Sequence, residues 1–296
     1  MLSVLPACVP VGVAGAAHSA SIVPRSTVTA LAADAGDVAF SAARNRVDCD
    51  RVFIWQKMSG RTFQLGKHQR CAVHAATVES VAVSGGRALW LTSTAGKTVD
   101  WQLWTATATK RTPRLLQFES RQPTDPEPIV VGSAGGGLLP YAVDTAVTTL
   151  KTNGSTAFSW TAPTPVVALA AADGRVAVAE AQKVTVLDAH GGIVSVDIYA
   201  SEISAVAFVP KGLLVQRGAV LEMRRGTDAH EFPTTADALL ADAGGNWTAW
   251  LDGKLVHVLH LPDGVQKATY AGSLAAFAGN RLYVANRRTI TVRTIR

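Results

Sequence analysis

Short apolar runs separated by tight polar turns recur along most of this chain, about every 36 residues. In a clear copy, the runs Val166–Ala171, Val176–Ala179 and Val184–Leu187 follow one another, with Asp173-Gly174 as the first turn. Units with this strand-like pattern cannot bury their apolar faces alone, so they must stack against one another. The pattern predicts a β-propeller.

Seven copies are found when each is anchored on its first apolar run. They start at Val28, Val78, Ile129, Val166, Ile203, Ala238 and Leu274. Four short strands and their turns need roughly 35 to 45 residues, so the last four copies are minimal and the first two carry about a dozen extra residues each. We expect the extra residues in loops.

The last copy is too short for four strands. It has room for strands at Leu274–Ala278, Arg281–Ala285 and Thr289–Thr294. An unpaired edge would then be exposed, so the segment near Ser21–Ser26 should supply the outer strand and close the ring. We therefore expect an all-β fold, a seven-bladed β-propeller of four-stranded antiparallel blades, as a single domain over residues 21–296.

Glycine and alanine refine this expectation. The glycine-rich segment Gly132–Gly137 lacks a helix to follow it and is not a phosphate or nucleophile motif, so its glycines should let a strand bend or a backbone approach closely. Alanine is frequent in the first run of each copy, as in Thr29–Ala33. It either fits strands that converge on a narrow axis or reflects a GC-rich genome.

The closing copy resembles a known repeat. Arg281-Leu-Tyr-Val-Ala-Asn286, followed by Thr289-Ile-Thr-Val292, is similar to the unit of YVTN-family propellers. More broadly, the units resemble the WD40-like repeats of bacterial exported proteins, with Phe53–Gln56 and Thr185–Asp188 where a Trp-Asp pair usually ends a strand. The resemblance implies a recognition scaffold, because such families act mostly by binding.

Two of the three cysteines suggest a disulfide. Cys49 and Cys71 flank the strands expected at Arg51–Gln56 and Thr62–Leu65, and a turn centred on Gly60 would place the two cysteines opposite each other. Two alternatives stay open: reduced surface thiols, and a zinc site in which His68 and His74 join both cysteines.

The first residues suggest export. Residues 1–20 are largely apolar and contain no Lys, Arg, Asp or Glu, with small residues before position 20, as in a signal segment, although no Lys or Arg opens it. Cys8 raises the alternative of lipidation. We expect a secreted or cell-envelope-associated monomer without a transmembrane span, because Pro6 and Pro10 interrupt the apolar run.

The net charge of +6 raises the question of nucleic acid binding. Arg and Lys are scattered and not interleaved with stacking aromatic residues, so we expect no nucleic acid partner. Enzyme motifs are also missing: Gly96-Lys97-Thr98 lacks the upstream glycine of a phosphate loop and fits a hairpin turn. We expect no cofactor and no resident metal.

Other polar residues have ordinary structural interpretations. His257 and His260 should point to opposite faces of one strand. Aspartates recur near turns, where the side chain caps its own backbone. They are Asp34, Asp37, Asp173, Asp242 and Asp263.

The expected binding surface is one rim of the ring. Loops between the second and third strands, and between blades, emerge on the same face, and the extra residues at 43–50, 93–97 and 121–127 belong to these loops. The candidate binding residues are Arg44, Arg46, Asp48, Asp50, Arg121, Asp125 and Glu127. We expect a non-enzymatic scaffold for a protein or envelope partner. The alternative is an exported propeller enzyme of lyase or lactonase type.

Overall fold

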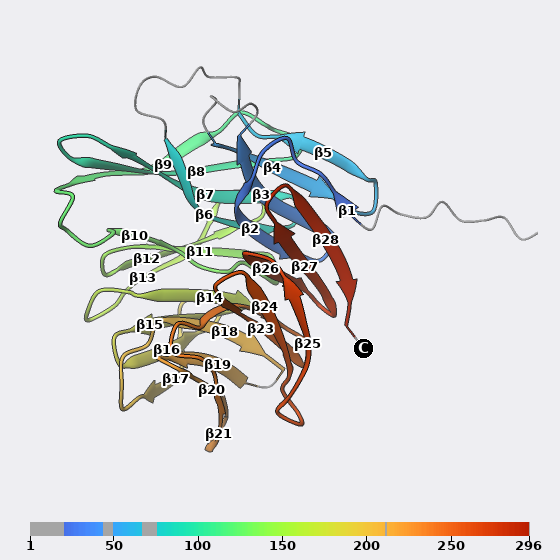
Figure 1. The fold of residues 1–296 in the computed structure, drawn as a ribbon. Coiled ribbons are helices and arrows are strands. Elements are labelled where there is room, and N and C mark those ends of the chain that lie inside the picture. The colour runs from blue at the N-terminus through green and yellow to red at the C-terminus, as the bar shows by residue number, and fades with distance from the viewer. Residues whose placement is uncertain (1–20, 44–49, 67–75, 211, 296) are drawn as a thin grey trace, which may run out of the picture.

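The structure is a computed structural model that describes residues 21–43, 50–66, 76–210 and 212–295. Within these ranges the fold is all-β, and seven four-stranded antiparallel sheets are arranged as the blades of a propeller (Figure 1). No helix long and apolar enough to cross a membrane occurs in this described part of the chain.

The first three blades occupy the N-terminal half of the chain. Blade 1 contains β2 (Val28–Asp34), β3 (Asp37–Ala43), β4 (Asp50–Gln56) and β5 (Arg61–Gln64). Blade 2 contains β6 (Thr77–Ser84), β7 (Arg87–Ala95), β8 (Val99–Thr107) and β9 (Arg114–Arg121). Blade 3 contains β10 (Ile129–Val131), β11 (Leu138–Val143), β12 (Ala146–Lys151) and β13 (Thr156–Thr161).

The next three blades are built from shorter units. Blade 4 contains β14 (Ala168–Ala172), β15 (Arg175–Glu180), β16 (Lys183–Leu187) and β17 (Ile193–Ile198). Blade 5 contains β18 (Ala205–Val209), β19 (Gly212–Arg217), β20 (Val220–Arg225) and β21 (Asp228–Pro233). Blade 6 contains β22 (Leu239–Gly244), β23 (Trp247–Asp252), β24 (Leu255–His260) and β25 (Val265–Ala271).

Blade 7 joins the two ends of the domain. Its strands are β26 (Leu274–Ala278), β27 (Arg281–Asn286), β28 (Thr289–Thr294) and, as the outer strand, β1 (Ser21–Ile22). In the ladder, Ser21 pairs with Thr291 and Ile22 with Ile290. The predicted closure of the ring by the N-terminal segment is therefore confirmed, as are the blade number and the strand order.

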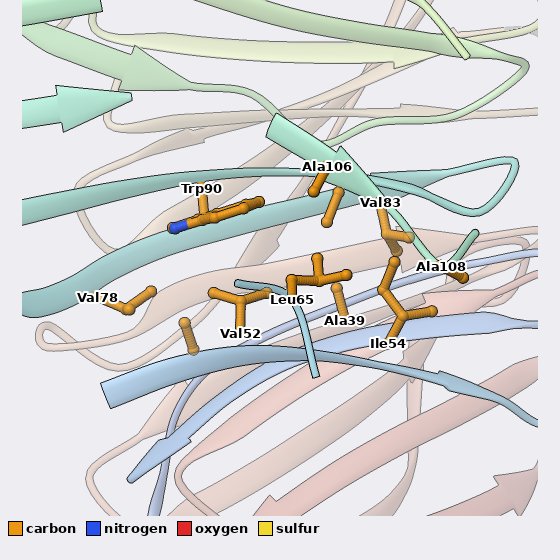
Figure 2. Close-up of a cluster of buried hydrophobic side chains, with 11 residues drawn as sticks. Ala39, Val52, Ile54, Leu65, Val78, Val83, Trp90, Ala106 and Ala108 are labelled. Carbon is orange, nitrogen blue, oxygen red and sulfur yellow. The ribbon is translucent and has the colours of Figure 1, made fainter. Parts of the chain in front are cut away.

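The core lies between the faces of neighbouring blades. Between blades 1 and 2, side chains from the two sheets point toward one another and exclude water (Figure 2). Ile54 of β4 is fully buried there, and the Trp90 ring of β7 packs against the same cluster. Similar clusters fill the other six interfaces between blades, so each sheet is stabilised mainly by its two neighbours.

Two local expectations are wrong. The extra residues of blade 2 do not form a loop at 93–97. The strands β7 and β8 continue as a ladder as far as the pair Ala95–Val99, because residues 93–95 find cross-strand partners at 99–101, and the turn is only 96–98. The hairpin of β4 and β5 pairs Gln56 with Arg61, whereas a turn centred on Gly60 requires Gln56 opposite Gln64.

The cause of the second error is the loop at residues 57–60. Gly60 is its last residue, with a φ of 67°, and its N–H donates to the carbonyl of Lys57. The expected pairing of Cys49 with Cys71 assumed a turn centred on Gly60. The hairpin of β4 and β5 has a different register, so that argument for the pairing does not hold. Both cysteines, together with His68 and His74, lie outside the described residues, as does Cys8.

Candidate functional site: one mouth of the central channel

A cavity of about 530 Å³ opens at one end of the central channel. Its wall consists mainly of the C-terminal ends of inner strands and the turns that follow them, contributed by β2, β10, β14, β18, β22 and β26, and Val81 of β6 completes it. Most lining side chains are alanine or glycine. The alanine-rich first runs thus lie at the narrow axis of the ring. This agrees with the first of the two explanations given for the alanines, namely strands that converge on a narrow axis.

This cavity lies on the face opposite the predicted rim. In each blade the inner strand starts at the connection from the preceding blade and runs to the turn before the second strand. The rim contains the blade-to-blade connections, whereas the cavity contains the turns after the inner strands, such as Asp34 and Asp173. We call this cavity the channel mouth.

The channel mouth is acidic. The charged residues among those that line it are Asp34, Asp173 and Asp242, and no described Lys, Arg or His belongs to the lining. Asp173 is exposed at the turn after β14 and adopts a φ of 49°, a conformation that Asp tolerates better than most residues. Electrostatic interactions are stronger in such a recess than on an open surface, because less water screens them.

Asp34 is held by a relay that joins three blades. The Ser84 hydroxyl of β6 donates to the Asp34 carboxylate at 2.6 Å and accepts a hydrogen bond from the Gly137 N–H at 3.2 Å. Ser84 is fully buried. These hydrogen bonds fix the Asp34 carboxylate at the edge of the cavity. Neither Ser84 nor Gly137 carries a positive charge that would neutralise it.

Asp242 belongs to the wall itself. It lies within β22, where its carboxylate accepts hydrogen bonds from the N–H of Ala243 at 2.8 Å and from that of Phe277 in blade 7 at 2.7 Å. Burial raises the pKa of Asp242 to about 7, the two backbone N–H donors oppose this shift, and the Asp34 charge adds to it. The side chain thus links blades 6 and 7 at the channel.

We expect Asp242 to make the fold more stable in acid. Its pKa is raised in the folded state, so its contribution is fully present below about pH 4 and is lost as the pH rises to about 7. Urea unfolding gives the free energy of unfolding of the wild type and of Asp242→Asn at about pH 4 and at about pH 7. Between these two pH values, the free energy of unfolding of the wild type should fall by on the order of 2 kcal/mol more than that of Asp242→Asn. Equal pH dependence of the two proteins would contradict this assignment.

A glycine-rich segment brings two inner strands into direct contact at the channel mouth. The N–H of Ser133 donates to the carbonyl of Leu169 at 3.1 Å, and the N–H of Ala171 donates to the carbonyl of Ser133 at 2.8 Å. A Cβ on Gly132 would lie 2.4 Å from the Cβ of Leu169. The prediction that glycines at 132–137 permit a close backbone approach is confirmed.

The predicted rim residues make their contacts within the chain. Arg121, at the end of β9, forms an ion pair with Asp144 at 2.5 Å, and the Asp125 carboxylate accepts from the N–H of Gln122 at 3.1 Å within a turn. Partial burial and then the nearby Glu79 carboxylate raise the pKa of Glu127 to about 7. Asp125 and Glu127 lie on the connection at 122–128, which follows Arg121 at the end of β9.

The other rim residues cannot be placed with them. Arg44, Arg46 and Asp48 lie outside the described residues, and Asp50 is described only as the first residue of β4. Whether the rim binds a partner stays a prediction.

Structure and sequence differ on the aspartates. Asp263 does cap a turn, by accepting from the N–H of Val265 at 3.0 Å. Asp34 instead accepts from Ser84, and the turn interpretation is wrong for Asp242, because it lies inside a strand and reaches the next blade. The sequence did carry a signal: the positions equivalent to Asp242 in five other blades are alanines. They are Ala32, Ala82, Ala170, Ala207 and Ala276.

The two histidines of β24 follow the sequence interpretation. His257 stacks on Trp250 and His260 packs on Trp247, on separate sides of the hairpin of β23 and β24. Among the described ranges, no three His, Cys, Asp or Glu side chains gather as they do around a metal ion. Residues 96–98 form the hairpin turn that was expected in place of a phosphate loop.

Comparisons with known proteins support the architecture. No family model matches the chain. No curated protein matches it either. Among the solved structures that resemble it is the crystal structure of Chaetomium thermophilum Raptor, with a TM-score of 0.60 and 12% sequence identity. The match covers 93% of this chain and 28% of the Raptor chain, so this chain spans little more than a quarter of that protein. At this identity the likeness concerns the fold alone, and no particular YVTN or WD40 family is established.

Proposed function

We propose that this chain is a non-enzymatic recognition scaffold whose channel mouth binds a cationic group of its partner. The observation that carries the proposal is the acidic lining: three carboxylates line the cavity, and no described basic residue does, in a chain whose net charge is +6. The positive net charge of the chain repels cationic ligands. An acidic recess in such a chain is therefore typical of a site that binds cations selectively.

The size of the channel mouth fits a side chain of a partner protein. A volume of about 530 Å³ falls in the range of ordinary ligand sites and can admit a Lys or Arg side chain with part of its backbone. Asp34 and Asp173 would pair with the cation at the mouth, and the small Ala and Gly residues leave space for its aliphatic stem. The partner in this proposal is a protein or envelope component that presents such a group outside the cytoplasm, as the apolar segment at 1–20 suggests.

One observation favours the enzyme alternative, namely the pKa of Asp242 at about 7 within a cavity. A general acid or base must exchange its proton with a bound substrate. The Asp242 oxygens accept from two backbone N–H groups, which supports a role in joining blades over one in catalysis.

The proposal can be tested with trilysine as the probe. Isothermal titration calorimetry should detect binding to the full chain that weakens with added salt, and triglutamate should not bind. Asp173→Asn should weaken trilysine binding about fivefold, because it removes one charge while Asn adopts the same left-handed backbone conformation.

Asp125→Asn is the matched control on the opposite face. It also removes one exposed carboxylate, and its amide oxygen can still accept from the N–H of Gln122. We expect it to bind trilysine as the wild type does. Absence of trilysine binding would refute the proposal, and a loss of binding in Asp125→Asn alone would move the site to the rim.

A further inference from the structure

Strand β17 presents an unusual edge. It is the outermost strand of blade 4, and several of its aliphatic side chains are largely exposed: Val194 at 56%, Val196 at 50% and Ile198 at 64%. Val196 and Ile198 lie on one face of the strand, and Val194 is the extra residue of a β-bulge. An edge strand with unprotected apolar side chains is a template for pairing with another strand.

The other outer strands lack this combination. They carry exposed charges or a proline, which discourage edge pairing, or they expose Thr and Ser, or they are only two residues long. The residues concerned are Arg61 in β5, Arg114 in β9, Thr156, Ser159 and Thr161 in β13, Asp228 and Pro233 in β21, Lys267 in β25, and Ser21–Ile22 as the whole of β1.

The backbone of β17 has free hydrogen-bonding groups at this edge. The N–H of Tyr199 donates to the carbonyl of Gln182 at 2.9 Å, in continuation of the ladder between β16 and β17. In an antiparallel strand, every second residue directs its backbone N–H and C=O groups to the same neighbouring strand. The backbone groups of Asp197, like those of Tyr199, are therefore directed to β16. Val196 and Ile198 therefore direct their N–H and C=O groups outward.

The one acidic side chain of β17 does not oppose pairing. Asp197 forms an ion pair with Arg224 of blade 5, at 3.5 Å. Arg224 also pairs with Glu222, so it offsets only part of the Asp197 charge. The remaining requirement is that the two Asp197 side chains do not lie opposite each other at the contact.

We propose that a second copy of this chain pairs with β17 in antiparallel orientation about a two-fold axis at Val196. In this register Val196 lies opposite Val196 of the second copy, Ser195 lies opposite Asp197, and Ile198 meets the bulge at Val194. Aliphatic residues thus meet aliphatic residues, and the two Asp197 side chains do not face each other. The two blades become one eight-stranded sheet, and the channel mouths remain open.

The register makes Val196 the most informative position. Sedimentation velocity of the full chain, from about 1 to about 100 μM, should show a dimer of the 31.0 kDa chain. Val196→Lys and Val196→Asp should each be monomeric, with the dissociation constant raised at least about 100-fold, since like charges then meet at the axis. An equimolar mixture of the two variants should form the dimer again, because Lys then lies opposite Asp.

Val265→Lys is the matched control. Val265 is a similarly exposed valine on β25, the outer strand of blade 6, so this variant should dimerise as the wild type does. A wild type that stays monomeric at about 100 μM, or a Val196→Lys protein that still dimerises, would overturn the proposal. A mixture that stays monomeric would overturn it too.

Discussion

Replacement of Gly132 by Ala should destabilise the fold by about 3 kcal/mol. The new Cβ would lie 2.4 Å from the Leu169 Cβ and 2.8 Å from the Leu169 carbonyl oxygen. Because a backbone atom cannot move aside as a flexible side chain can, β10 must retreat from β14. The two hydrogen bonds between Ser133 and blade 4 would then be stretched or lost.

Urea unfolding measures this effect, and Gly96→Ala is its control. Gly96 lies in the short turn between β7 and β8, where an added Cβ would lie 3.4 Å from the Thr98 carbonyl oxygen and the backbone has no left-handed φ. We expect the control to change the free energy of unfolding by less than about 0.5 kcal/mol. A Gly132→Ala protein as stable as this control would show that blades 3 and 4 do not touch through their inner strands.

Replacement of Trp55 by Ala should cost about 3 to 5 kcal/mol. Trp55 of β4 is fully buried where blade 1 meets the closing blade, and its ring meets the Tyr283 ring of β27 edge-on, with 6.3 Å between centroids. Truncation leaves a cavity at the interface between the first and last blades. Since that interface seals the ring, its loss should weaken every blade together.

Phe118→Ala serves as the control for aromatic truncation. Phe118 lies on β9, an outer strand, and is half exposed, so its removal should cost less than about 1 kcal/mol. Thermal and urea unfolding of both variants, followed by tryptophan fluorescence and far-UV circular dichroism, would compare them. Equal stability of Trp55→Ala and wild type would mean that blades 1 and 7 are not packed together.

The sequence predicts the ring well because the ring depends on repetition. Each inner strand starts within two residues of the expected apolar run; β14, for example, begins at Ala168 where Val166 was expected. Closure was also predictable, since the last copy offers three strands and an unpaired edge must be covered. These features follow from local pattern and from the number of strands a blade needs.

Registers and strand lengths depend on less visible details. Gly60 occupies the last position of its loop and not the centre, and this choice shifts the whole pairing of β5. The longer strands of blade 2 arise because residues 93–95 pair with 99–101, although Ser and Thr in that stretch also suit a loop. In both cases, cross-strand partners decide between two locally acceptable conformations.

The channel mouth was missed because its parts come from separate blades. Asp34 and Ser84 are 50 residues apart, much farther than the parts of a local motif, and Asp242 contacts the backbone of the following blade. Their meeting depends on how the blades converge on the axis. A comparison of equivalent positions would nevertheless have singled out Asp242, as a carboxylate where five of the six other copies have alanine.

Methyl NMR tests the closed ring most directly, because the channel mouth exists only if the two ends of the domain meet. Ile22 of β1 pairs with Ile290 of β28, and directly opposed side chains have Cβ atoms about 4.5 to 5.5 Å apart. In the unmodified chain with labelled isoleucine methyl groups, we predict a nuclear Overhauser effect between Ile22 and Ile290. Its absence, together with a random-coil shift for the Ile22 methyl group, would contradict the closure and the site built on it.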